Sequence, residues 1–256
     1  WPSMCSAILT MVEDERVEVL DLESDIVVYH PADHRLLLCD SLQKKDRFET
    51  FPAFSPDGRT LYFCSAEAKK IPEEYKEIRY NLCSIDFDPS AGTFGSRIDT
   101  LVNAEALGKS VSFPRPSYDG KYIMFTLSDY GNFSIWHKEA NLWLLDLTSG
   151  DLRELSEVNS DDTESFHNWS SNSRWFVFSS RRGDGLYTHL YLASMDENGK
   201  ISKPFLLPQE DPETYYDRSV YSYNVPDFVN APILLDTKVF EKRITSKERI
   251  QVQVGN

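Results

Sequence analysis

Basic residues are scarce in this chain. Lys and Arg number 27 against 41 Asp and Glu, which gives a formal net charge of −14 at pH 7. Proteins that bind nucleic acid neutralise phosphates with clustered Lys and Arg, and the sequence holds no such cluster. Long hydrophobic runs are missing too, since no stretch reaches the roughly 18 apolar residues that a membrane-spanning helix needs. We therefore expect no nucleic-acid partner and no segment that spans a membrane.

Motifs for metal, cofactor and nucleophilic chemistry are also missing. The four cysteines, Cys5, Cys39, Cys64 and Cys83, form neither a Cys-x-x-Cys pair nor a Cys-x-x-Cys-His haem-attachment segment. The sequence lacks a Gly-x-Ser-x-Gly elbow, a Gly-rich phosphate loop and a His-Glu-x-x-His motif. We expect no catalytic residue, no cofactor and no metal, and we expect the cysteines to be unpaired thiols.

Three weaker metal signals remain. His30 and His34 flank one turn, and acidic clusters occur at 161–164 and 210–213. Calcium favours several oxygen ligands, but neither cluster has the spacing of an EF-hand loop. Solvated turns and loops are the favoured interpretation of all three.

Internal repeats carry the prediction of the fold. The segments 51–63, 113–125 and 166–178 align without gaps: each has a leading Phe, a short strand, Ser, a tight turn, a basic residue and an apolar strand. Asp-Gly occupies the first two turns and Asn-Ser the third, and these residues tolerate the positive φ that a tight hairpin needs. The strand after each turn is apolar at successive positions, which indicates a sheet covered on both faces.

Two further strands follow each aligned segment, so each repeat offers four antiparallel strands in a length typical of a propeller blade. The first fifty residues fit the same template imperfectly, because their first hairpin lacks the Asp-Gly signal. The predicted blades are 1–50, 51–112, 113–165 and 166–208. Residues 209–256 form a C-terminal extension, in which the alternating segment 250–254 could complete a sheet.

The block Phe-Pro-Ala-Phe-Ser-Pro-Asp-Gly-Arg at 51–59 resembles the WD40-like repeat of the TolB family, periplasmic propellers of the bacterial cell envelope. Segments 94–100, 171–178 and 223–226 resemble TolB-like envelope proteins described as cytochrome c biosynthesis proteins. Some of those carry a Cys-x-x-Cys-His segment upstream, which this chain lacks, so no haem role is carried over. The resemblance says little about function, because such repeats serve many purposes.

The resemblance implies an all-β fold, a β-propeller of four-stranded antiparallel blades, and a periplasmic or cell-envelope location. TolB-type propellers usually close with six blades. Either this ring closes with fewer, or the chain is part of a larger six- to eight-bladed ring. We favour the larger ring, because the first residue falls at the start of a repeat.

The connections between the second and third strands are the candidate binding surface. They span about 65–80, 127–140 and 179–188, and in propellers such loops emerge on one face. They carry aromatic and guanidinium groups, which are suited to recognition. The candidate residues are Tyr75, Trp136, His137, Arg181 and Arg182. The Arg pair would attract an acidic ligand; alternatively, Tyr75 and Trp136 pack back against the rim.

The sequence thus predicts a non-catalytic binding platform in the bacterial cell envelope, whose partner is another protein or an envelope component. One alternative is a propeller-type enzyme, a polysaccharide lyase or a glycosidase, and a glycosidase requires two opposed carboxylates. The other alternative is a structural subunit of an envelope complex.

Overall fold

The computed structural model describes residues 3–11, 17–234 and 236–255. In these residues the protein is mainly β-structure, with two short α-helices near the C-terminus and several single turns of 3-10 helix. The strands are β1 (Ser3–Met11), β2 (Val17–Ile26), β3 (Val28–His30), β4 (Arg35–Leu37), β5 (Arg47–Phe54), β6 (Thr60–Glu67), β7 (Asn81–Asp88), β8 (Thr93–Val102), β9 (Ser110–Pro116), β10 (Tyr122–Ser128), β11 (Asn141–Asp146), β12 (Leu152–Glu154), β13 (Glu164–Trp169), β14 (Trp175–Ser180), β15 (His189–Ser194), β16 (Phe205–Leu206) and β17 (Gln253–Gly255). The helices are α1 (Pro212–Arg218) and α2 (Thr237–Thr245).

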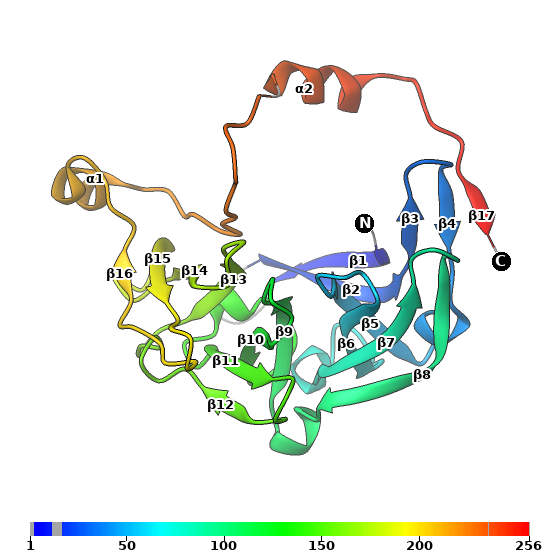
Figure 1. Cartoon of the computed structure of the whole chain (residues 1–256), viewed down its shortest axis with the longest axis horizontal. Helices are drawn as coiled ribbons and strands as arrows, with labels where there is room; N and C mark the ends of the chain where they lie inside the picture. Colours follow the sequence, from blue (N-terminus) through cyan, green and yellow to red (C-terminus); the bar gives the residue numbers. More distant parts are fainter. Residues whose placement is uncertain (1–2, 12–16, 235, 256) are drawn as a thin grey trace.

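Three four-stranded antiparallel sheets make up most of the molecule. They are β5-β6-β7-β8, β9-β10-β11-β12 and β13-β14-β15-β16, and in each sheet every strand pairs with the next along the chain. The first strands of the three sheets, β5, β9 and β13, lie beside one another, and the sheets fan outward from them (Figure 1). This is the arrangement of propeller blades, and it confirms the predicted all-β propeller of four-stranded antiparallel blades.

The first fifty residues depart from the four-stranded pattern. β1 and β2 form a two-stranded hairpin, and β2 lies against β5, whereas β3 and β4 pair in a separate sheet. β3 and β4 have three residues each, and the second neighbour of β4 is β17 and not a strand of the β1–β2 hairpin. The expectation of one four-stranded sheet for this segment is therefore corrected, while the boundaries of the other predicted blades stay predictions.

The repeated turns form as their residues predict. Gly58 and Gly120 have φ of 71° and 70°, and Ser173 has φ of 57°. In the first copy Ser55 Oγ donates to Asp57 Oδ1 over 2.6 Å, and the amide of Thr60 donates to Ser55 Oγ over 2.9 Å. The same two bonds recur in the other copies, through Ser117, Asp119 and Tyr122, and through Ser170, Asn172 and Trp175.

The hydrophobic core lies between neighbouring blades. The second strand of each sheet is buried along nearly its whole length, and Phe63, Phe125 and Phe178 have no exposed surface. Both faces of these strands are covered, as their non-alternating sequence predicts. Buried polar bonds also join blades: Trp169 Nε1 donates to the carbonyl of Arg115 over 3.1 Å.

Three of the cysteines are free thiols, as expected: Cys39, Cys64 and Cys83. In the β6–β7 ladder Cys64 pairs with Leu82 and Cys83 pairs with Phe63. Cys64 and Cys83 are therefore one position out of register and point to opposite faces of the sheet. The side chain of Cys5 lies outside the described residues.

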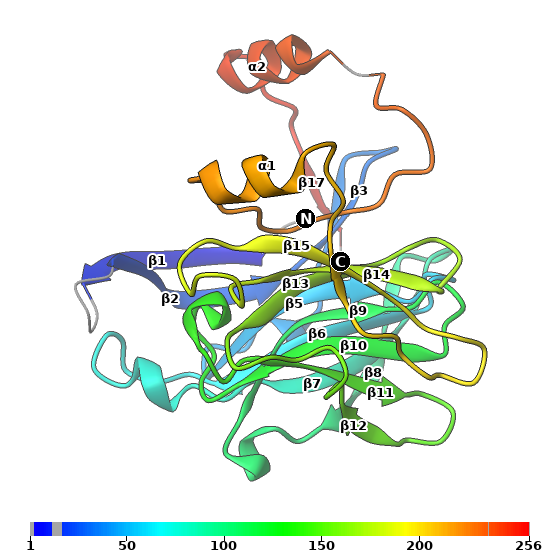
Figure 2. The same ribbon diagram turned by 90° about the vertical axis from the view of Figure 1, so that its left-hand side faces the viewer.

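The C-terminal segment leaves the last blade and arches through α1 and α2 back to the N-terminal side (Figure 1). There β17 pairs in parallel with β4, with Val254 opposite Leu36. β17 thus completes a three-stranded sheet with β3 and β4 (Figure 1). Figure 2 shows that α1 and α2 lie outside the blades. Among the described residues no helix is long and apolar enough to cross a membrane.

Candidate functional site

The leading Phe of each repeat has an unusual backbone. Phe51, Phe113 and Phe166 have φ of 52°, 53° and 50°, the left-handed region that bulky side chains rarely adopt. Each lies where its strand slips by an extra residue against its neighbour, a β-bulge in the first strand of its blade. Bulges redirect side chains. Three blades thus use the same strained device at the same repeat position.

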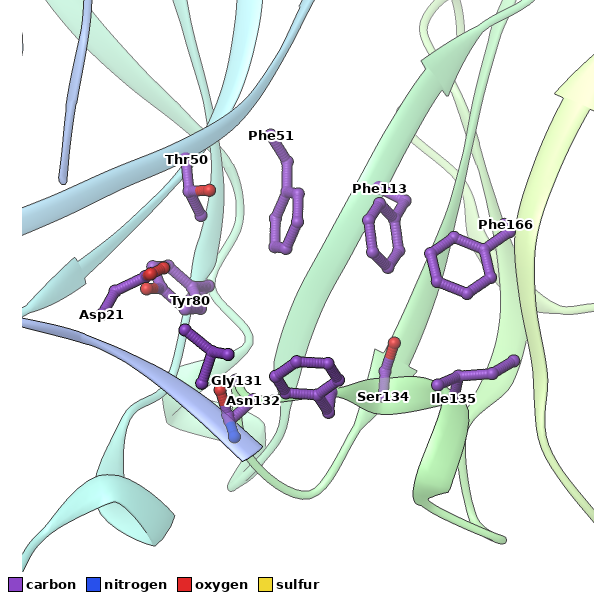
Figure 3. A pocket seen from close by; sticks show the side chains of 12 residues that line it. Asp21, Thr50, Phe51, Tyr80, Phe113, Gly131, Asn132, Ser134, Ile135 and Phe166 are labelled. Carbon is purple, nitrogen blue, oxygen red and sulfur yellow. The ribbon is translucent and has the colours of Figure 1, made fainter. Parts of the chain in front are cut away.

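These bulges bring the three Phe rings into one row at the centre of the fan. The ring centroids of Phe51 and Phe113 are 4.4 Å apart, and those of Phe113 and Phe166 are 4.7 Å apart. Successive rings are tilted by 52° and 49° to each other. Figure 3 shows the row with one ring from each blade.

An open pocket of about 360 Å³ lies against this row. Its walls come from β2, from the three Phe-bearing strands and from the β6–β7 and β10–β11 connections. The lining residues are Val19, Asp21, Thr50, Phe51, Tyr80, Phe113, Gly131, Asn132, Phe133, Ser134, Ile135 and Phe166. We call this space the axis pocket. Its surface is mostly apolar and aromatic, as is usual for pockets that bind small molecules.

One carboxylate and one phenol lie together at the β2 side of the axis pocket (Figure 3). Burial raises the pKa of Asp21 above its usual range. Burial also raises the pKa of Tyr80, and the charge of Asp21 raises it further. Among the described residues that line the pocket there is no Lys, Arg or His, so the lining itself supplies no cation to Asp21.

Gly131 lets the β10–β11 connection approach the pocket wall. A Cβ atom at this position would lie 2.4 Å from Tyr80 Cδ2, closer than two such carbons can approach. The amide of Gly131 donates to the carbonyl of Ile78 over 3.0 Å, which holds the connection in place. Phe133 then projects at the rim with 41% of its surface exposed.

A second cavity, of about 160 Å³, adjoins the axis pocket and shares Phe133, Ile135 and Phe166 with it. Two of the residues singled out from the sequence, Trp136 and Arg181, line this neighbour. The Arg181 guanidinium lies 4.5 Å from the Trp136 ring centroid. The predicted loop face therefore continues directly into the axis pocket.

The remaining candidates are held by neighbouring loops. Tyr75 meets the ring of Tyr130 edge to face, with centroids 5.7 Å apart. His137 is only 5% exposed; its Nδ1 lies 3.1 Å from Glu139 Oε1, and its ring packs on Tyr130. Of the two aromatic candidates, Trp136 is the more exposed, at 38%.

The two arginines are not presented to solvent as the sequence suggested. Arg182 pairs with the buried Glu164, Nη2 to Oε1 over 2.8 Å, and lies over the Tyr191 ring. Arg181 is 9% exposed and donates to the carbonyl of Gly185. The expectation of a guanidinium pair open to an acidic ligand is thus corrected, because blade packing uses both groups. Binding by the five candidates stays a prediction.

The weaker metal signals resolve into separate local contacts. His30 Nδ1 lies 2.6 Å from Asp33 Oδ1, and His34 Nδ1 lies 2.5 Å from the Tyr29 hydroxyl. Glu164 turns inward to Arg182, away from the acidic cluster at 161–164. Among the described residues no group of three or more His, Cys, Asp or Glu side chains is placed to hold a metal ion.

Sequence reasoning found the leading Phe residues as markers of the repeat but not as parts of a site. Their recurrence at one repeat position was the available signal. Asp21, Tyr80, Gly131 and Phe133 reach the axis pocket only through tertiary packing, and none carries a local motif.

Comparison of the sequence with protein-family models and with curated proteins finds no match. Among solved structures, the chain is similar to TolB from Acinetobacter baumannii (17% identity, TM-score 0.36, 77% of this chain and 40% of that one). It is also similar to a putative TolB from Agrobacterium tumefaciens (17% identity, TM-score 0.40, 78% and 59%). A third similar structure is an oligogalacturonate lyase in complex with manganese (12% identity, TM-score 0.46, 79% and 51%). The chain thus spans about half the length of these proteins.

Proposed function

We propose that this chain is a non-catalytic binding platform of the bacterial cell envelope, which holds another protein or an envelope component at the axis pocket. The observation that carries the proposal is the row of three Phe rings, one from each blade, beside an open pocket. Aromatic side chains provide much of the binding energy at recognition surfaces.

The repeated backbone strain supports a role beyond packing. A bulky residue in the left-handed region costs on the order of 1 kcal/mol or more, and such strain tends to collect at functional sites. The chain adopts this conformation three times at equivalent positions, and each time the ring reaches the axis pocket. The exposed rim at Phe133 and Trp136 gives a partner access from the loop face.

Binding is favoured over the enzyme alternative because of what lines the pocket. A glycosidase positions two carboxylates on opposite sides of the scissile bond. Among the described residues of the axis pocket, Asp21 is the one carboxylate, and Phe113 and Phe166 lie on the side away from it (Figure 3). In the described part of the chain, no specific contact favours the structural-subunit alternative.

The test is capture of partners from an envelope extract by immobilised protein, with quantitative mass spectrometry. Wild type is compared with Phe113→Leu and Phe133→Ser, which remove rings from the axis pocket. The matched control is Phe54→Leu, because Phe54 is 40% exposed and lies outside this pocket.

The proposal predicts a component that is lost with both pocket variants and retained by the control. Equal capture by all four proteins would contradict it. Turnover of a polysaccharide by the wild type, abolished by Asp21→Asn, would establish the enzyme alternative instead.

A further inference from the structure

We propose that the axis pocket selects an alkylammonium cation, carried either by the lysine side chain of a partner or by a free quaternary ammonium compound such as choline. This inference rests on the proposed function and names the chemistry of the group that is bound. It is argued from the side chains that face the pocket and from their charges.

The first argument is the aromatic content of the lining. Five of the lining residues are aromatic: Phe51, Tyr80, Phe113, Phe133 and Phe166. An aromatic ring attracts a cation to its face, and several rings around one space form the cages that bind quaternary ammonium groups. Three of these rings, Phe51, Phe113 and Phe166, form the row in which successive rings are tilted by about 50°.

The second argument is a carboxylate with no basic side chain among the described residues of the lining. Asp21 lies in the lining beside Tyr80, and the described lining residues include no basic side chain. Removal from water disfavours the charged form of a carboxylate, which is why its pKa is raised. A bound cation would offset this cost, whereas an anion would increase it.

The third argument combines size with long-range charge. A volume of about 360 Å³ accommodates a trimethylammonium group or the end of a lysine side chain, and it lies at the small end of ligand pockets. The chain carries a net charge of −14, so its field draws cations toward the pocket and repels anions.

The experiment is isothermal titration of the whole chain with three probes. Choline is compared with 3,3-dimethylbutan-1-ol, its neutral isostere with carbon in place of nitrogen, and with N-acetyl-lysine methylamide. The variants are Asp21→Asn and Phe113→Leu. The matched control is Asp25→Asn, which removes a carboxylate from the same strand but outside the axis pocket.

We expect choline or the lysine derivative to bind at least about fivefold more tightly than the neutral isostere. We expect Asp21→Asn and Phe113→Leu each to weaken that binding about fivefold or more, and Asp25→Asn to weaken it less than twofold. Preference for choline indicates a quaternary ammonium group, and preference for the lysine derivative indicates a protein partner.

Two results would overturn the inference. If the neutral isostere binds as tightly as the cations, the pocket selects apolar groups; the proposed function then stands and the cation does not. If no probe binds saturably, the cation also fails, and the proposed function is decided separately by the capture experiment.

Discussion

Glu49 offers the sharpest test of how the N-terminal hairpin is joined to the blade that begins with β5. Glu49 is 1% exposed, and its Oε1 accepts from Ser65 Oγ over 3.5 Å. Among the described residues, Oε2 has no hydrogen-bond partner. Burial raises the pKa of Glu49 to about 7; Arg47 opposes the shift, and Asp25 on β2 adds to it. The folded protein therefore holds Glu49 protonated over a pH range in which the unfolded chain releases the proton.

The sign and size of the effect follow from linkage. Because the pKa of Glu49 is raised in the folded protein, its stabilising contribution is fully present below about pH 4.5 and is lost as the pH rises to about 7. Between pH 5 and pH 8 the loss in unfolding free energy is about 2.5 kcal/mol, at about 1.36 kcal/mol for each pKa unit. The glutamine of Glu49→Gln cannot ionise, so the unfolding free energy of this variant should rise relative to that of wild type by about 2.5 kcal/mol between pH 5 and pH 8.

The assay is urea denaturation of both proteins at pH 5, 6, 7 and 8. Any constant cost of burying the amide cancels when the two ends of the series are compared. Glu73→Gln is the control, because the Glu73 side chain is 58% exposed and should show no such trend. A difference between Glu49→Gln and wild type that stays flat with pH, or that falls as pH rises, would refute the reasoning.

Three further predictions concern the site and its surroundings. Arg182→Met should lower the unfolding free energy, measured by urea denaturation, by about 3 kcal/mol, because it leaves the buried Glu164 without its ion-pair partner. A double variant that also carries Glu164→Gln should recover stability. Gly131→Ala should displace Tyr80 or the β10–β11 connection, because the added Cβ would clash with the Tyr80 ring. Capture of the partner should weaken, and the melting temperature should fall only slightly. Trp136→Ala should weaken binding of a captured partner by about 1 kcal/mol or more and leave the melting temperature nearly unchanged. A large fall in melting temperature with capture intact would instead identify Trp136 as a packing residue.

The sequence predicted the blades because their signals are local. A Ser followed by Asp-Gly or Asn-Ser in each turn determines the hairpin through bonds within a few residues, as Ser55 and Asp57 show. The apolar strand after each turn indicated burial on both faces, and Phe63 and Phe125 are buried accordingly. The first fifty residues were harder to predict because their hairpin lacks these local signals.

The pocket could be predicted only in part. The leading Phe was visible as a repeat marker, but its left-handed backbone arises from a bulge that depends on pairing with the next strand. Arg182 resembled a recognition residue because nothing near it in sequence indicates Glu164 as its partner, 18 positions away. Asp21 lies on β2 and Phe133 lies in the β10–β11 connection, so only the packing of the sheets around the axis pocket brings them together. Further blades that would complete a six- to eight-bladed ring stay a prediction.

Photo-crosslinking from the rim of the axis pocket tests the central claim most directly. Benzoylphenylalanine replaces Phe133, which is 41% exposed at the rim. In a parallel sample it replaces Tyr118, which is 54% exposed in the turn between β9 and β10 and does not line the pocket. Illumination in an envelope extract should give a discrete crosslinked product from position 133 and none from position 118, and excess choline or lysine derivative should reduce the product. Equal products from both positions, or a product from position 118 alone, would contradict binding at the axis pocket.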